Sequence, residues 1–272
     1  MELKFIKTSP TENMTLLIET PVPREKQLEI AERLIAYHSV YAEQAGYVEE
    51  AEDPRAEKRL QMMAGEFCGN ATLSLAAWLA KEKGLGIGER TEILLEVSGA
   101  AELVRCELRR EEQGFWGRVS MPLPKQITEA VFRLDEQELR LPVVEFDGIS
   151  HVIIPMERWE KIGREQAEQA ARLWAKELPP AFGLLLFDEA QRQLRPLVSV
   201  ENVSLIWERG CGSGTAAIGA YLAMREKDSV AVSLAQPGGS MGVEVNWEAG
   251  KIKEIFLTGY VAIVAEGTAY LP

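Results

Sequence analysis

Of 272 residues, 46% are hydrophobic and 26% are charged, a balance typical of a folded protein with one large or two smaller domains. The formal net charge of −12 argues against a nucleic-acid partner, because a phosphate backbone would meet charges of its own sign. No apolar run approaches the ~20 residues that span a bilayer, and the N-terminus lacks the basic and apolar segments of a secretory signal. We therefore expect a cytoplasmic protein whose partners include neither nucleic acid nor a membrane.

Apolar patterns define the expected elements of the N-terminal half. A strand is expected at Met14–Ile18, and an amphipathic helix follows at Arg24–Tyr37. A second helix begins at Cys68 and is apolar nearly all round, which predicts that it is buried. Further strands are expected at Ile93–Val97 and Leu103–Leu108, where apolar and polar residues alternate.

Two prolines in Met121–Pro124 break any continuing element and indicate a linker. The expected domains are therefore residues 1–124 and 125–272, with the last strand able to pack on the N-terminal half. In the second domain an amphipathic helix is expected at Glu157–Leu178, and another helix that is apolar nearly all round begins at Cys211. The expected strands of this half are Val143–Phe146, Val152–Pro155, Gly183–Phe187, Val203–Trp207, Val230–Leu234 and Val261–Ala265.

The two buried helices begin with similar sequences about half the chain length apart. Cys-Gly-Asn-Ala-Thr starts at Cys68 and Cys-Gly-Ser-Gly-Thr starts at Cys211. This internal repeat predicts a duplicated domain. The expected fold class is α+β, with two pseudo-symmetric domains that each roll a β-sheet or barrel around a central buried helix.

The cysteines are few and widely separated, and the chain has only two histidines. This inventory argues against a zinc site and against a disulfide framework, so no metal is expected. Cys106 lies in an alternating strand and is expected to be structural. The other two cysteines are expected to act as a nucleophile, a base or a redox centre.

A helix N-terminus favours negative charge, so a cysteine placed there is more readily ionised. The unpaired N–H groups of the first turn can also hold a carboxylate. If Cys68 and Cys211 flank one substrate carbon, one thiolate can remove the α-proton from one face while the opposite thiol protonates the other. Such a scheme needs no cofactor. The residues expected to hold the substrate carboxylate by their N–H groups are Gly69, Asn70, Gly212 and Ser213.

These motifs resemble the diaminopimelate epimerase-like superfamily of pyridoxal-independent racemases, which includes the proline racemases. The resemblance covers nearly the whole chain: Cys68-Gly69-Asn70 looks like the first cysteine motif, and Glu208–Thr215 looks like the second. It implies catalytic cysteines between two pseudo-symmetric domains, and a homodimer is common in the family. His151 looks like a family histidine near one cysteine and is expected to contact substrate, and Glu208 occupies the place of a helper carboxylate.

Several departures argue against diaminopimelate as the substrate. Cys211 follows Gly210 at once, which is closer to proline racemase spacing, and Ile149 stands where diaminopimelate epimerases place a substrate-binding asparagine. Ala71-Thr72-Leu73 replaces a glycine and an arginine. The compact Trp207–Thr215 pattern is more similar to the histidine racemases that supply D-histidine for opine-type metallophores, so histidine is the favoured substrate among free amino acids.

Weaker expectations concern other polar residues. Asn13 is a candidate substrate contact, and Glu43 is a candidate partner for a cationic substrate group, whereas His38 is expected to be structural. Gly212–Ala217 nominally fits a dinucleotide-binding pattern, but no acid ends the next strand, so that interpretation is rejected. Alternative functions are an epimerase of diaminopimelate or another amino acid, a phenazine-biosynthesis-type isomerase of the same fold, and a thiol-redox ligand-binding protein.

Overall fold

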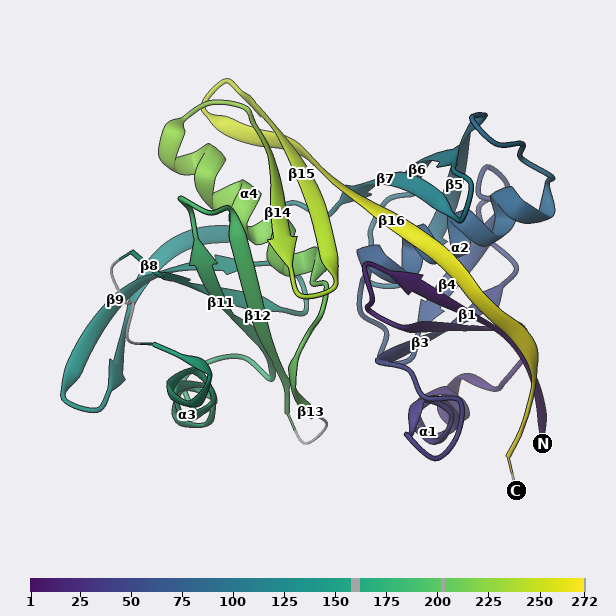
Figure 1. Ribbon diagram of the computed structural model, residues 1–272, viewed down its shortest axis with the longest axis horizontal. Helices are drawn as coiled ribbons and strands as arrows, with labels where there is room; N and C mark the ends of the chain where they lie inside the picture. The colour runs from purple at the N-terminus through teal and green to yellow at the C-terminus, as the bar shows by residue number, and fades with distance from the viewer. Residues whose placement is uncertain (158–161, 202–203, 272) are drawn as a thin grey trace. The chain divides into compact units, whose positions relative to one another are not determined.

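The computed structural model describes residues 1–157, 162–201 and 204–271. The protein has an α+β fold built mainly of strands (Figure 1). Contacts divide the chain into two compact units. Unit 1 consists of Met1–Met121 and Leu257–Pro272, and unit 2 consists of Pro122–Phe256. Within the described ranges, no helix is long and apolar enough to cross a membrane.

The sheet of unit 1 closes on itself. Its strands are β1 (Glu2–Pro10), β2 (Thr15–Ile18), β3 (Gln44–Glu49), β4 (Lys58–Met62), β5 (Arg90–Val97), β6 (Val104–Arg110), β7 (Phe115–Met121) and the later part of β16 (Lys251–Tyr270). Neighbours follow chain order from β1 to β7, β7 lies beside β16, and β16 pairs antiparallel with β1. Closure removes the exposed edges that an open sheet would leave.

Helix α2 (Gly69–Glu82) lies inside this closed sheet and contacts all seven strands from β1 to β7. Alanines and leucines make it a good helix former, and its apolar surface is buried on nearly every side. The polar side chains that are buried with it find partners: the Thr8 and Ser74 hydroxyls are 2.8 Å apart. The helix ends where charged residues return and Gly84 takes a positive φ of 74°. The shorter helix α1 (Arg24–Ile35) packs on β3.

Unit 2 places helix α4 (Gly212–Glu226) against β9, β10, β14 and β15. Its strands are β8 (Gln126–Leu134), β9 (Gln137–Glu145), β10 (Ser150–Pro155), β11 (Ala181–Asp188), β12 (Gln193–Val200), β13 (Ser204–Trp207), β14 (Val230–Gln236), β15 (Gly239–Glu248) and the start of β16. Their order is β8-β9-β10-β11-β12-β14-β15-β16, and β13 pairs with β12 off this path. Helix α3 (Arg164–Trp174) contacts β12.

Both units repeat one order of strand pairings. In unit 1, β2 and β3 are parallel across α1, β3 and β4 are antiparallel, and β4 and β5 are parallel across α2. In unit 2, β10 and β11 are parallel across α3, β11 and β12 are antiparallel, and β12 and β14 are parallel across α4. In each unit the helix that begins with a cysteine is therefore the crossover to the unit's later strands.

Most expected strands lie within observed ones, but several boundaries differ; for example, the helix expected at Arg24–Tyr37 ends at Ile35. The helix expected at Glu157–Leu178 is shorter: α3 begins at Arg164, where the Gln166 side chain accepts the Gly163 N–H at 3.2 Å, and it ends at Trp174. Part of that expectation, residues 158–161, lies outside the described residues, as does Val203 of the strand expected before Trp207. Unit 2 ends at Phe256, and the later part of β16 pairs with β1 of unit 1.

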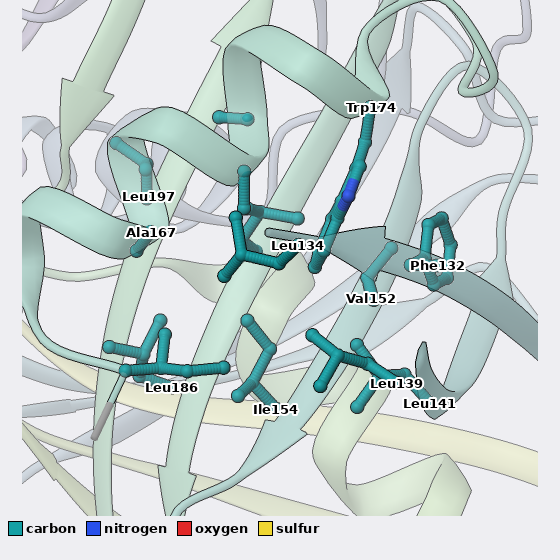
Figure 2. Close-up of a cluster of buried hydrophobic side chains, with 14 of the residues drawn as sticks. Phe132, Leu134, Leu139, Leu141, Val152, Ile154, Ala167, Trp174, Leu186 and Leu197 are labelled. Atoms are coloured by element: carbon teal, nitrogen blue, oxygen red, sulfur yellow. The ribbon is translucent and has the colours of Figure 1, made fainter. Parts of the chain in front are cut away.

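The core of unit 2 lies between α3 and the adjoining strands. Figure 2 shows its side chains, which include Phe132, Leu134, Leu139, Leu141, Val152, Ile154, Ala167, Trp174, Leu186 and Leu197. The largest is Trp174, which is 1% exposed. Its ring centroid lies 4.7 Å from that of Phe132, and its Nε1–H donates to the Arg133 carbonyl at 2.8 Å. One side chain thus holds α3 on the sheet through both packing and a hydrogen bond.

We expect Trp174→Ala to lower the free energy of unfolding by about 3–5 kcal/mol, because it leaves a cavity and an unpaired carbonyl. Urea denaturation followed by circular dichroism measures the loss. The neighbouring Leu173 is 49% exposed, so Leu173→Ala is the matched control and should cost less than about 0.5 kcal/mol. Equal losses in the two variants would contradict this account of how α3 is held.

Candidate active site

Cys68 caps the N-terminus of α2. Its backbone is extended (φ −134°, ψ 110°), and its Sγ accepts the N–H of Ala71 at 3.4 Å. Its carbonyl accepts from both the backbone N–H and the hydroxyl of Thr72, at 2.9 and 2.7 Å. The sulfur therefore points at the positive end of the helix dipole, where a thiolate is stabilised. Because Cys68 is only partly buried, solutes can reach it.

Gln44, at the start of β3, makes the second contact of the Cys68 sulfur. The thiol donates to Gln44 Oε1 at 3.1 Å. The other end of the amide, Nε2, donates to Asn13 Oδ1 at 2.9 Å and to Thr15 Oγ1 at 2.8 Å. Two acceptors for the amide nitrogen fix its rotation, so the oxygen is the atom that faces the sulfur. Gln44 thus favours the protonated, neutral form of Cys68.

The other residues expected in this half lie around the same helix start. Asn13 is 3% exposed and joins the network through Gln44, whereas Glu43 immediately precedes Gln44 and is partly buried. Gly69 and Asn70 form the buried first turn of α2. A Cβ on Gly69 would lie 2.9 Å from the Met121 sulfur, so a larger residue here would have to displace the Met121 side chain. Unit 1 therefore connects Asn13 with Cys68 through Gln44, and Glu43 is the residue before Gln44 in the sequence.

Cys211 caps α4 in the same way. Its backbone is extended (φ −105°, ψ 107°), its Sγ accepts the N–H of Gly214 at 3.4 Å, and its carbonyl accepts the Thr215 hydroxyl at 2.7 Å. Gln236 adds a clamp: its Oε1 accepts the Cys211 N–H at 2.8 Å and its Nε2 donates to Thr215 Oγ1 at 2.7 Å. Cys211 is only 3% exposed.

Glu208 sets the electrostatics around Cys211. Burial raises the pKa of the Glu208 carboxyl to about 7, and its hydrogen bond with Cys211 acts in the opposite direction. Burial also raises the pKa of the Cys211 thiol well above its ordinary value, as do the charge of Glu208 and the same hydrogen bond, while the Ser213 hydroxyl and the Gly214 N–H lower it. The carboxyl and the thiol therefore compete for protons in a weakly solvated space.

His151, at the start of β10, lies behind this cysteine and has no exposed surface. Its Nε2 lies 3.0 Å from Ser213 Oγ, which in turn lies 3.6 Å from Cys211 Sγ. Burial lowers the pKa of His151 to about 3, so the ring is neutral at physiological pH. His151 was expected to contact substrate, and this stays a prediction; the polar contact that the structure gives it is with Ser213. Unit 2 thus brings together His151, Glu208, Cys211, Gly212 and Ser213.

Two glutamines and two threonines of the site were not singled out from the sequence. Gln44 and Gln236 reach their cysteines from strands far away along the chain, and a glutamine at a strand end carries no recognisable pattern. Thr72 and Thr215 were visible as the shared threonine of Cys-Gly-x-x-Thr, but no role followed from that pattern. Their identical bonds to the cysteine carbonyls explain why both repeats carry threonine.

All three cysteines are free thiols. Cys106 is fully buried in β6, and burial raises the pKa of its thiol, which agrees with a structural role. Across the ranges that the structure describes, no group of three His, Cys, Asp or Glu side chains is arranged to hold a metal ion. Polar chemistry at the two helix starts is therefore carried by sulfur, carboxyl, amide and hydroxyl groups.

Comparison with known proteins identifies the family to which the chain is similar. The family model described as histidine racemase CntK N-terminal domain matches residues 2–270. The chain belongs to this family. Histidine racemases of Fusobacterium nucleatum and Staphylococcus aureus are 32% and 29% identical to it, each over 99% of this chain and 97% and 98% of their own lengths. The chain is accordingly an isomerase, an amino acid racemase or epimerase, as its cysteine motifs led us to expect.

Solved structures agree on the fold. A hydroxyproline epimerase from Agrobacterium vitis with bound trans-4-hydroxy-L-proline superposes with a TM-score of 0.76 at 13% identity, covering 99% of this chain and 93% of that chain. A probable proline racemase from Agrobacterium radiobacter K84 gives a TM-score of 0.74 at 16% identity, with the same coverage. The α+β fold is thus that of proline racemase-like enzymes.

Gln44→Glu should suppress the reactivity of Cys68. A carboxylate in contact with the sulfur raises the pKa of the thiol by at least about one unit, so alkylation near neutral pH should slow about tenfold or more. Iodoacetamide labelling as a function of pH, quantified by peptide mass spectrometry, measures this. Gln113→Glu adds the same charge in an exposed turn and should leave the Cys68 curve in place. Equal curves for Gln44→Glu and the parent would contradict the contact.

Glu208 should make stability depend on pH. Because its pKa is raised in the folded protein, its contribution is fully present below the ordinary value of 4.5 and is lost as the pH rises through about 7. We expect Glu208→Gln to gain stability relative to the parent between pH 5 and pH 8, measured as the difference in urea midpoints. The exposed Glu201→Gln is the control and should show no such trend. A difference that is independent of pH would contradict the burial of this carboxyl.

Proposed function

We propose that this chain is a histidine racemase that inverts the α-carbon by a two-base mechanism with Cys68 and Cys211 as the acid and the base. The observation that carries the proposal is the shared geometry of the two sulfurs: each belongs to a helix-capping cysteine and accepts a first-turn N–H at 3.4 Å. Histidine as the substrate is supported by the family, in which the full-length relatives are histidine racemases.

The proposal includes a duplicated, pseudo-symmetric origin of the two units. It is supported by the repeated order of strand pairings around α1 and α2 and around α3 and α4. It is also supported by the repeated bond from Thr72 and Thr215 to the cysteine carbonyls, 2.7 Å in both cases. Two copies of one helix start are a direct way to supply one sulfur for each face of a stereocentre.

In the proposed reaction the substrate carboxylate accepts hydrogen bonds from first-turn N–H groups, which stabilise the negative charge that develops when the α-proton leaves. One thiolate takes the α-proton, so a C–H bond breaks and an S–H bond forms. The opposite thiol gives its proton to the other face of the carbon, so an S–H bond breaks and a C–H bond forms. No electrons are transferred, and the two sulfurs exchange protonation states in each turnover. The scheme needs no cofactor.

Glu43 is our candidate contact for the substrate side chain. It precedes Gln44 at the start of β3 and is partly buried, so a cationic imidazole nitrogen of histidine would find a carboxylate near Cys68. Gly69, Asn70, Gly212 and Ser213 are the proposed carboxylate binders, because they form the first turns that follow the two cysteines.

Incubation of the purified protein with L-histidine in deuterated water tests the function. We expect deuterium at the α-position and growth of the D-isomer, read by NMR and chiral chromatography. Cys68→Ser and Cys211→Ser should each lower turnover by at least about a hundredfold. Cys106→Ala is the matched control and should keep turnover, because that thiol is fully buried in β6.

Several outcomes would overturn parts of the proposal. Racemisation that survives both cysteine substitutions would remove the two-base mechanism. Exchange with proline or diaminopimelate but not with histidine, in the same assay, would replace the substrate. Reversible thiol oxidation without α-proton exchange on any common amino acid would favour a redox role instead.

A further inference from the structure

We infer that His151 acts on Cys211 through Ser213: the imidazole donates its Nε2–H to the Ser213 oxygen, and this turns the Ser213 hydroxyl proton onto the Cys211 sulfur. His151 is then a positioning residue rather than a substrate contact. The inference deepens the proposed function and rests on it for the role of Cys211 in turnover, but its structural part can be tested without turnover.

Three polar atoms, one from each residue, form two successive short contacts. His151 Nε2 lies 3.0 Å from Ser213 Oγ, and Ser213 Oγ lies 3.6 Å from Cys211 Sγ, within hydrogen-bond range for sulfur. Either atom of each pair could donate, so the direction of the chain depends on which imidazole nitrogen carries the proton. Because the fully buried ring is neutral, one nitrogen carries a proton and the other carries a lone pair.

The surroundings of His151 Nδ1 decide the tautomer. Nδ1 is buried and has no hydrogen-bond partner among the described residues. Its close neighbour is Gly183 on the paired strand β11, where a Cβ would lie only 2.4 Å from Nδ1. The glycine hydrogen in that direction therefore points at Nδ1. A C–H group can face a lone pair but repels an N–H group, and a buried N–H without an acceptor is costly. The proton consequently belongs on Nε2.

This tautomer orients the serine. With Nε2–H as donor, the Ser213 oxygen accepts from the ring, and its own single proton is left to donate elsewhere. The Cys211 sulfur is the acceptor in reach. A hydroxyl that donates to sulfur favours the thiolate, which opposes the burial and the Glu208 charge that raise the pKa of Cys211.

The two thiols therefore differ in one neighbour, although Cys211 also has a hydrogen bond with Glu208 that favours its thiol form. Cys68 donates to the amide oxygen of Gln44, which favours a thiol, whereas Cys211 receives a proton donor from Ser213, which favours a thiolate. Glu208 is the charged group that acts on Cys211 directly, and Arg209, the next residue, donates to the Pro237 carbonyl at 3.2 Å. The hydrogen bonds from His151 through Ser213 to Cys211 thus oppose the increase in the Cys211 pKa that Glu208 causes within unit 2.

Nitrogen-15 NMR of the histidine rings tests the tautomer in the intact protein. The chain has only two histidines, so His38→Gln assigns the His151 signals. We expect the neutral Nε2–H tautomer, with no titration between pH 5 and pH 8, and a changed Nε2 shift in Ser213→Ala. An Nδ1–H tautomer, or a ring that titrates in this range, would overturn the inference.

A second arm tests the effect on the sulfur. In a background with Cys68→Ser and Cys106→Ala, the ultraviolet absorbance of the thiolate reports Cys211, because it is then the one remaining cysteine. We expect Ser213→Ala and His151→Leu to raise the pKa of Cys211 by about half a unit to one unit, and His151→Gln, which keeps an N–H donor, to restore part of the shift. An unchanged Cys211 titration in Ser213→Ala, which keeps the backbone N–H for substrate, would overturn the inference.

In the enzyme with all cysteines, Ser213→Ala should lower kcat for histidine about tenfold with less than a twofold change in KM. A loss that falls on KM alone would instead assign Ser213 to substrate binding and overturn the positioning role. If the parent protein exchanges no α-proton of any amino acid, the proposed function fails, whereas the tautomer and the Cys211 titration still decide the hydrogen-bond chain.

Discussion

A sulfur that accepts an N–H from the first turn of a buried helix is the interaction on which both halves of this protein depend. The geometry is the same at Cys68 and Cys211, and in each case a threonine one turn later holds the cysteine carbonyl. Each helix is buried by the strands around it. Its N-terminus presents N–H groups that have no partner within the helix, and these groups stabilise a negative charge. Fold and chemistry thus share one requirement.

The neighbours of the two sulfurs make them unequal. Gln44 offers an acceptor to Cys68, whereas Ser213 and Glu208 act on Cys211 with opposite signs. A racemase must accept both mirror images, and in the mechanism that we propose the two thiols alternate between acid and base in each turnover. Different partners for the two thiols allow each pKa to be adjusted separately, although the helix starts that hold them are alike.

Much of this site was predictable, and the exceptions have physical reasons. The cysteines and their helices were predicted from a repeated local motif. The motif is recognisable because its cysteine and threonine both form the first turn of the helix. Gln44 reaches Cys68 only through strand pairing across a long stretch of chain, so no local pattern indicates it. The burial of His151 depends on Gly183, the residue opposite it on β11, and nothing in either segment alone predicts that contact. The α2 and α4 boundaries were clear because charge returns at their ends, whereas α3 begins at Arg164, just after a glycine, inside a longer amphipathic pattern.

Strand β16 has a consequence for how the chain acquires its structure during synthesis. Its later part, from Leu257 onward, lies between β7 and β1, pairs with both and so closes the sheet of unit 1. The ribosome releases Met1–Met121 first, but those residues hold two open sheet edges until the last strand emerges. Unit 2 is made from one continuous segment and can finish folding earlier. The half that is translated first is therefore the half that matures last, and its unpaired edges are where chaperones would be needed.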